Sequence, residues 1–239
     1  MSTSMRILEI PKRPDPRLVA ELAQLATSHL SDSMEGLYAA GPQLRPMHKE
    51  GKLAGPAYTV KTAAGDNLLV QKALDTARRG DVIVVDAGGF LDSAIIGEMM
   101  MARARRRGVA GLVIWGAIRD SAEIGAGSYP VFAAGVTHRK PTRNGPGEIN
   151  VPVVVGGLVV NPGDIIVGDA DGLVAILLEQ ADKILASAKA ILAKETVARK
   201  QIEDGTEDRT WIDKALKEKG YAVRDESKEE TGQFELSSH

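Results

Sequence analysis

Two apolar segments of this chain each follow an amphipathic segment that closes on arginine and glycine. "DVIVVDAGG" (81–89) follows "DNLLVQKALDTARRG" (66–80), and "VAGLVIWG" (109–116) follows "SAIIGEMMMARARRRG" (93–108). The earlier member of each pair has the apolar spacing and basic last turn of a helix, and the later member is typical of a buried strand. Strands that alternate with helices predict an α/β domain with at least some parallel strand pairing.

The remaining segments extend this domain on both sides. Leucines at helical spacing predict a helix over 16–36, and a glycine-broken apolar run predicts a strand over 53–65. Between residues 129 and 178 short β runs are separated by Gly, Pro and Asn, so this section is expected to be more purely β. A long helix is predicted over 179–203 and a short helix over 210–220.

We expect one main domain over residues 1–205. Residues 206–239 would form a C-terminal helix and a charged tail, which lies at a subunit interface or is partly disordered. Within the main domain, "RGDVIVVDAGG" (79–89) and "PGDIIVGDADG" (162–172) are closely similar. We interpret this similarity as one turn–strand–turn structure used twice, and not as a repeat architecture.

Composition excludes several classes of protein. The 239 residues are 44% hydrophobic and 26% charged, with a formal net charge of −2. This length can bury a substantial core, and the near-neutral charge gives no reason to expect a nucleic acid or an anionic membrane as a partner. The absence of cysteine excludes disulfides, thiolate metal sites and cysteine nucleophiles. No apolar signal segment and no run long enough to span a membrane is found, so a cytoplasmic protein is expected.

The strand at 109–116 runs into adjacent opposite charges, Arg119 and Asp120. One interpretation is a capping box, with Asp120 at the N-cap of a helix and Glu123 at the third position. The other is that Arg119 binds a carboxylate in a bidentate manner while Asp120 holds a hard cation. The two are compatible, because α/β folds place their ligands at the ends of strands.

Three other features allow both a functional and a structural interpretation. Glu98 follows a glycine-rich loop at the start of a helix, where backbone N–H groups can bind an anion, or it is a helix-dipole residue on a solvated face. The arginines of "RARRR" (103–107) stand in the last turns of the same helix, and a solvated face is favoured over nucleic-acid binding. Lys61 is a candidate Schiff-base lysine, although a half-exposed strand lysine is the stronger interpretation.

Glu98, twenty intervening residues and then Arg119-Asp120 form a more specific pattern than any of these features alone. Around it stand "GDNLLVQKAL", "GDVIVVDAGG", "RRRGVAGLVIWGAIRD" and "GEINVPVVVGGLVVNPGDIIVGDADG". With these motifs the chain resembles the ribonuclease-activity-regulator-A-like (RraA-like) family over roughly residues 20–205. That family includes the 4-hydroxy-4-methyl-2-oxoglutarate and 4-carboxy-4-hydroxy-2-oxoadipate aldolases.

The resemblance implies a fold and an activity. The fold would be an αββα domain, with central β-sheets flanked by helices and a C-terminal helical extension, assembled as a homotrimer or homohexamer with sites between subunits. The activity would be that of a lyase: a Mg²⁺- or Mn²⁺-dependent aldolase that cleaves a small 4-hydroxy-2-oxo acid to pyruvate. Decarboxylation of oxaloacetate passes through the same enolate, so one site could support both reactions.

The resemblance also implies roles for individual residues. Asp120 would ligate the metal, Arg119 would bind the pyruvate part of the substrate, and Glu98 would hold a water that protonates the enolate. A glutamate of a neighbouring subunit would complete the site, and Glu195 is our candidate. These groups suit the chemistry, which needs a sink for negative charge and a source of a proton.

Substrate binding would fall to Gly97, Met99, Met100 and Arg119, with the backbone N–H groups of Met99 and Met100 on the substrate carboxylate. Two departures from the family pattern bear on the substrate. The aldolases usually have aspartate where this chain has glutamate in the acid position. They commonly have Asp-Gly where this chain has Trp115-Gly116.

Two alternatives remain at this stage. The chain could be a non-catalytic regulator that binds a ribonuclease E-like protein, as another branch of the family is described, which requires only a surface. It could also be a Schiff-base aldolase that uses Lys61 and needs no metal.

Overall fold

A computed structural model of the chain describes residues 5–221, so the charged tail expected after the last helix lies outside the described residues. Contacts divide the chain into two compact units, 1–193 and 194–239, and the boundary falls inside the long helix. The first unit begins with α1 (Pro16–Leu22), α2 (Thr27–Asp32), β1 (Arg45–Pro46), β2 (Leu53–Thr62), α3 (Leu68–Thr76), β3 (Val82–Asp86), β4 (Ala94–Ile96), α4 (Glu98–Arg107), β5 (Gly111–Ile118) and α5 (Ser121–Gly125).

The later half of the unit consists mostly of short strands, as its composition predicts. It contains β6 (Val131–Val136), β7 (Gly147–Ile149), β8 (Val153–Val155), β9 (Leu158–Val160), β10 (Ile165–Gly168), β11 (Leu173–Ile176) and the 3₁₀ turn η1 (Leu178–Gln180). Helix α6 (Ala181–Asp204) starts in this unit and continues into the second one, which also holds α7 (Thr210–Glu218).

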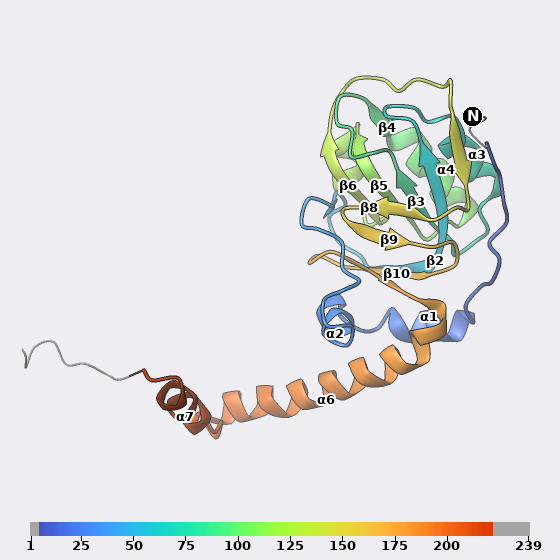
Figure 1. Ribbon diagram of the computed structural model, residues 1–239. Coiled ribbons are helices and arrows are strands. Elements are labelled where there is room, and N and C mark those ends of the chain that lie inside the picture. The colour runs from blue at the N-terminus through green and yellow to red at the C-terminus, as the bar shows by residue number, and fades with distance from the viewer. Residues whose placement is uncertain (1–4, 222–239) are drawn as a thin grey trace, which may run out of the picture. The chain divides into compact units, whose positions relative to one another are not determined.

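Within the described residues, nine strands form one curled sheet with the order β1-β6-β5-β3-β2-β10-β11 (Figure 1). Strand β4 pairs with β5, and β7 pairs with β2. The pairs β2–β3, β3–β5, β4–β5 and β5–β6 are parallel, whereas β10 and β11 are antiparallel neighbours. A separate hairpin is formed by β8 and β9. This mixed sheet with helices around it confirms the expected α/β class.

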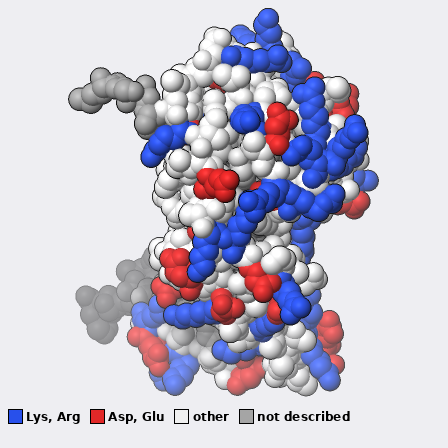
Figure 2. Space-filling view, turned by 90° about the vertical axis from the view of Figure 1, so that its right-hand side faces the viewer, with Lys and Arg blue, Asp and Glu red and all other residues white. Residues whose placement is uncertain are grey.

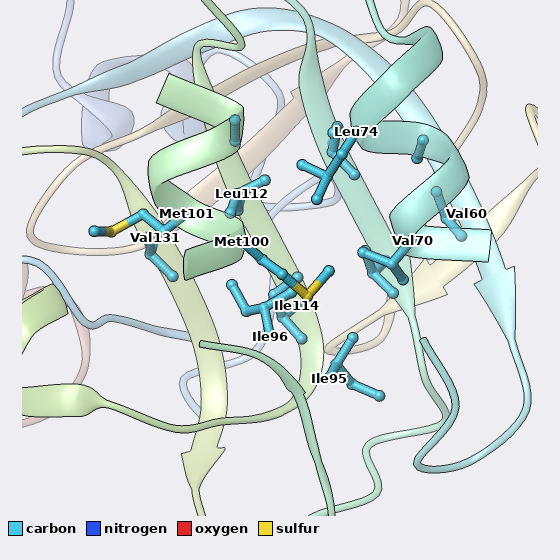
Figure 3. Packing of buried hydrophobic residues seen from close by; sticks show 14 of the residues in the cluster. Val60, Val70, Leu74, Ile95, Ile96, Met100, Met101, Leu112, Ile114 and Val131 are labelled. Atoms are coloured by element: carbon cyan, nitrogen blue, oxygen red, sulfur yellow. The ribbon is translucent and has the colours of Figure 1, made fainter. Parts of the chain in front are cut away.

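The central strands β3 and β5 are apolar except for Asp86 at the end of β3, as is typical of strands whose two faces are both buried. In β3, Ile83 and Val85 point to a cluster that includes residues of α3 and α4, whereas Val82 and Val84 point to a cluster that includes the β8–β9 hairpin. Helices α3 and α4 therefore cover one face of the sheet and the hairpin covers the other (Figure 1). Figure 3 shows the helix-covered face, where Met100 of α4 packs among isoleucines of the sheet.

Helices α1 and α2 and the first half of α6 pack on β10 and β11 in a third cluster, which includes Leu22, Leu30, Ile176 and Ile184. The helix predicted over 16–36 is therefore wrong as a single element, because the structure has two short helices there. The second of them begins at Thr27, where the carboxylate of Asp169 accepts hydrogen bonds from the backbone N–H and the hydroxyl of Thr27. A residue 142 positions away thus sets the start of α2.

The helix predicted over 93–108 is also shorter than expected. Residues 94–96 form β4, which pairs in parallel with β5, and α4 begins only at Glu98. The C-terminal end is as predicted, since Gly108 takes the left-handed conformation (φ 77°) that commonly ends helices. The arginines of the last turns are exposed, as a solvated face requires. On the face drawn in Figure 2, Lys and Arg side chains gather in a band across the middle and upper right, and Asp and Glu are scattered around it.

The two similar segments adopt the same local structure. Each has a buried aspartate directly before or at the start of a strand, and each aspartate accepts a hydrogen bond from the backbone N–H three residues earlier. Asp81 binds the N–H of Arg78 at 2.8 Å, and Asp164 binds the N–H of Asn161 at 2.8 Å. The interpretation of one turn–strand structure used twice is therefore confirmed. No helix among residues 5–221 is long and apolar enough to cross a membrane.

Candidate active site

The parallel pairing of β4 with β5 brings together two segments that are separated by a helix in the sequence. Ile96 stands opposite Ile118, so Gly97 follows β4 beside the point where Arg119 and Asp120 follow β5. The backbone N–H of Arg119 donates to the carbonyl of Ile96 at 3.0 Å, which holds the two strand ends together. The spacing noticed in the sequence therefore reflects adjacent strand ends in space.

The carboxylate of Asp120 lies at the N-terminus of α4. Its Oδ2 accepts a hydrogen bond from the backbone N–H of Glu98 at 3.0 Å. Gly97, the N-cap residue, permits this approach, because a Cβ there would clash with Asp120 Oδ2 and would stand 3.0 Å from Cγ of Arg119. The carboxylate thus occupies the position of an anion at a helix start, where unpaired N–H groups and the helix dipole favour negative charge.

The capping box interpreted from Asp120 and Glu123 is wrong. Asp120 does precede α5, but its side chain forms no capping hydrogen bond to that helix. Its backbone adopts the left-handed conformation (φ 56°, ψ 42°), and the side chain is directed instead to the start of α4. A tertiary contact has taken the place of the local one. The strained conformation is one that aspartate tolerates better than most residues.

Arg119 stands next to this carboxylate without being fully paired by it. Its Nε lies 3.6 Å from Asp120 Oδ2, which is an ion-pair distance and too long for a hydrogen bond. The same Nε is buried and has no hydrogen-bond partner among the described residues. The side chain as a whole is 42% exposed. Part of the guanidinium group therefore remains available to an anionic ligand.

Five of the predicted site residues line one cavity of about 560 Å³: Gly97, Met99, Met100, Arg119 and Asp120. Glu98 is tied to Asp120 through its backbone N–H, but its half-buried side chain is not part of the cavity wall. The N–H of Met100 donates to the carbonyl of Gly97 at 3.1 Å. The N–H of Met99 has no acceptor within residues 5–221, so it is the helix-start amide that can most readily meet a ligand.

Sequence reasoning missed another part of the cavity wall, which includes Asn67, Lys140 and Arg143. Asn67 is buried and donates from Nδ2 to the carbonyl of Ile95 at 2.9 Å, which leaves its Oδ1 without a partner in the described part of the chain. The segment "GDN" was a signal for this wall, because its Asp and Asn are polar residues followed directly by the amphipathic helix α3.

Asp66 holds that wall in place. Its carboxylate accepts hydrogen bonds from the backbone N–H groups of Leu68 and Asn144 and from the hydroxyl of Thr142. Burial alone would raise the pKa of this carboxyl, but the hydrogen bonds together outweigh burial and lower the pKa below its ordinary value. The lowered pKa favours the ionised form of Asp66, whose hydrogen bonds to Thr142 and Asn144 fix the loop after β6.

Other predicted residues lie elsewhere. Trp115 belongs to the face of β5 that packs away from α4, and its indole lies against Gly89, where an added Cβ would be 3.1 Å from the ring. It does not line the cavity, so its effect on the cavity wall is indirect. Lys61 is exposed on β2 and is also outside the cavity, which favours the strand-lysine interpretation. Glu195 belongs to the second unit and is described apart from this cavity.

Comparisons with known proteins place these features in a family. A family model described as "RraA-like: Aldolase/RraA" matches residues 27–175. The chain belongs to the RraA-like family. A relative from Halalkalibacterium halodurans is 37% identical over 203 residues, which cover 85% of this chain and 92% of that protein; it carries the name "Putative 4-hydroxy-4-methyl-2-oxoglutarate aldolase". A relative of the same name from Burkholderia multivorans is 40% identical and covers 62% of this chain and 93% of its own.

Solved structures agree with the RraA-like fold. The Streptomyces coelicolor protein RraAS2, described as an unusual member of an RNase ES inhibitor family, has a TM-score of 0.70 at 29% identity and covers 79% of this chain and 98% of its own. The RNA-processing inhibitor RraA of Thermus thermophilus has a TM-score of 0.59 at 34% identity, covering 63% and 92%. The family thus includes proteins named as enzymes and proteins named as regulators.

Proposed function

We propose that this RraA-like protein is a divalent-metal-dependent lyase that cleaves a 4-hydroxy-2-oxo acid, such as 4-hydroxy-4-methyl-2-oxoglutarate, to pyruvate. The observation that carries the proposal is the cavity at the start of α4, where the carboxylate of Asp120, the incompletely paired guanidinium of Arg119 and the amide of Met99 meet. The names of the relatives from Halalkalibacterium and Burkholderia support the same reaction class.

The residues present fit a hard cation bound chiefly through water and substrate oxygens. Oδ2 of Asp120 accepts a hydrogen bond from the N–H of Glu98, and the side chain is 39% exposed, so the carboxylate keeps capacity to bind a cation. Among the described residues no cluster of three or more His, Asp or Glu side chains that could hold a metal is found. Mg²⁺ commonly binds through one or two carboxylates and keeps several waters, so a single carboxylate is compatible with it. When bound, such a cation would stabilise negative charge that develops on the 2-oxo acid.

The chain's own groups have separate tasks in this proposal. Arg119 would bind the carboxylate of the pyruvate part, and the N–H of Met99 would orient the same carboxylate. Glu98, the first residue of α4, would position the water that protonates the C3 carbon of the product. Oxaloacetate would lose CO₂ at the same site, because its decarboxylation generates the same charge next to the same cationic groups.

A second copy of the chain would complete the site with Glu195, as the family implies, in a trimer or hexamer. Apolar side chains that are exposed on the first unit support self-association, among them Val136 (52% exposed), Val154 (47%) and Val159 (55%). Light scattering during size exclusion tests the assembly. A mixture of inactive Asp120→Ala and inactive Glu195→Gln chains would recover part of the activity if each site draws on two copies.

The decisive experiment measures pyruvate release from 4-hydroxy-4-methyl-2-oxoglutarate and from oxaloacetate, with and without EDTA. Turnover should require Mg²⁺ or Mn²⁺ and should be lost in Asp120→Ala, while Asp213→Ala, which removes an exposed carboxylate in α7, should behave as wild type. Turnover that survives EDTA, together with a covalent enzyme–substrate adduct trapped by borohydride, would instead identify a Schiff-base aldolase. A complete lack of turnover across a panel of 4-hydroxy-2-oxo acids would favour the non-catalytic regulator.

A further inference from the structure

A groove between α3 and α4 carries three arginines that have no role in the proposed reaction. It is a hollow of about 240 Å³, which we call the arginine groove, lined by Gln71, Leu74, Asp75, Arg103, Arg106 and Arg107. The arginines stand at positions i, i+3 and i+4 of α4 and therefore share one face of the helix, where like charges repel one another. Among the described residues none of the three forms an ion pair with a carboxylate, and Asp75 is the single acidic residue of the groove wall. The groove is therefore suited to an anionic partner.

The second unit carries the opposite charge where α6 joins α7. Glu203, Asp204, Glu207 and Asp208 stand there, and we call them the acidic junction. Glu203 and Asp204 belong to the last turn of α6, which contains no basic residue, so their charges oppose the helix dipole instead of complementing it. The carboxyl of Asp208 accepts hydrogen bonds from the hydroxyl and the N–H of Thr210, which lower its pKa and favour its charged form. In the described part of the chain these four carboxylates form no ion pair.

The described part of the second unit also has no core of its own. Every residue from 194 to 221 is exposed or half-buried, and the exposed apolar side chains include Val197 (59% exposed), Ile202 (59%) and Trp211 (64%). Helices without a buried face have little stability in water, so this segment is expected to pack on another surface. Because Ile202 directly precedes the acidic pair, that surface should combine basic groups with an apolar contact. The arginine groove offers both, since the buried Leu74 also lines it.

We propose that the acidic junction of one copy of the chain docks in the arginine groove of a second copy, where its carboxylates pair with the guanidinium groups. Pairs of arginine with carboxylate can be bidentate, so they fix the orientation of the docked segment as well as attract it. The groove and the junction both belong to this chain and have opposite charge, so a second copy supplies a complementary partner.

This inference rests on the proposed function only for the place of Glu195. The arginine groove shares Gln71 and Arg103 with the active-site cavity, so the two hollows adjoin. Glu195 precedes Glu203 by eight positions of the same helix, which is about 12 Å along its axis. One docked helix could therefore present Glu195 at the cavity and the acidic junction at the groove.

A cross-link between two chains tests the contact and needs no turnover. The chain has no cysteine, so Arg106→Cys in one chain and Glu203→Cys in another each introduce a single thiol at an exposed position. The two chains are produced together, one of them with a tag that changes its mass, treated with a short bismaleimide and separated under denaturing conditions. A product that contains one chain of each kind is expected. Its yield should fall several-fold in 1 M NaCl, because salt screens the attraction.

Charge reversal tests whether the ion pairs hold the copies together. Arg106→Glu combined with Arg107→Glu should raise the dissociation constant for self-association by about tenfold or more, as measured by light scattering. Glu203→Lys combined with Asp204→Lys should have the same effect. A mixture of the two kinds of chain contains complementary pairs only and should recover association. Arg105→Glu is the matched control and should associate as wild type, because Arg105 is an exposed arginine of the same helix that does not line the groove.

Three results would each overturn the proposal: no cross-link between different chains, a cross-link that forms only within a single chain carrying both cysteines, or equal weakening of association by Arg105→Glu. A cross-link between chains in a preparation that releases no pyruvate would instead overturn the proposed reaction and leave the contact standing. Pyruvate release without the cross-link would overturn the contact alone.

Discussion

The carboxylate of Asp120 has a role in stability, at the start of α4, and a proposed role in catalysis. Different replacements of Asp120 separate the two roles. The stability task follows from the hydrogen bond that Oδ2 accepts from the N–H of Glu98 at 3.0 Å. Loss of a side-chain acceptor at a helix N-terminus costs about 1 kcal/mol, and the interaction of the negative charge with the helix dipole contributes about 0.3–1 kcal/mol more. Because the side chain is 39% exposed, solvent screening places the total near the lower end, about 1 kcal/mol.

The left-handed backbone conformation at Asp120 makes its replacements differ in their effect on the free energy of unfolding. At φ 56° and ψ 42°, alanine is disfavoured by about 1 kcal/mol, whereas asparagine tolerates the left-handed region much as aspartate does. Asp120→Ala should therefore lose about 2 kcal/mol, from the bond and from the conformation together. Asp120→Asn keeps an acceptor oxygen and should lose no more than about 0.5 kcal/mol. Asp120→Gly loses the bond but relieves the strain, and should fall between them.

Urea and thermal unfolding followed by circular dichroism measure these differences, and pyruvate release measures activity on the same preparations. For a unit of this size, the loss in Asp120→Ala corresponds to a Tm lower by about 4–8 °C. Asp120→Asn should unfold close to wild type and yet be inactive, because the neutral amide is a poor ligand for a hard cation. The reasoning is refuted if Asp120→Asn is as unstable as Asp120→Ala, or if it keeps wild-type turnover.

Three further predictions concern the surroundings of the site. In Gly97→Ala the added methyl group would displace the carboxylate of Asp120 and the guanidinium of Arg119, so activity should fall by about 100-fold while far-UV circular dichroism stays the same. Unchanged kinetics would contradict the close approach of these side chains to Gly97. Arg13→Ala leaves the fully buried carboxylate of Asp81 without its bidentate partner and should lower the free energy of unfolding by about 2 kcal/mol in urea titrations, whereas Arg17→Ala should not. The pKa of Asp66 is lower in the folded state, so its contribution to the free energy of unfolding is complete above about pH 4 and is lost as the pH falls through the folded pKa. The difference in the free energy of unfolding between wild type and Asp66→Asn should therefore narrow in acid. A difference that does not depend on pH would argue against an ionised Asp66.

The local patterns of the sequence predict much of the fold. Continuous apolar runs identify β3 and β5 as strands buried on both faces, and helix ends marked by arginine and glycine locate the end of α4 at Gly108. These predictions succeed because hydrophobic periodicity and backbone preferences act over a few residues. The same holds for the two similar segments, whose aspartates form their turns with neighbours three residues away.

The candidate site was predicted in part. The spacing of Glu98 from Arg119 and Asp120, together with the resemblance, leads to two strand ends that the structure places side by side and to a cavity that most of the predicted residues line. The basic wall with Lys140 and Arg143 was missed, because these residues belong to a loop without periodicity. Hydrogen bonds to residues far away in the sequence, among them Asp66 and Ala94, bring that loop to the cavity.

What the sequence by itself determined is the set of elements and the residues available at their ends. What only the tertiary structure decided is where those ends meet. The start of α2 is set by Asp169 across 142 positions, and the start of α4 is capped by Asp120 across 22. A carboxylate can cap its own helix or another one, and the two are equivalent in local sequence. Packing of the sheet selects between them, because it alone brings the distant N–H group within hydrogen-bond distance.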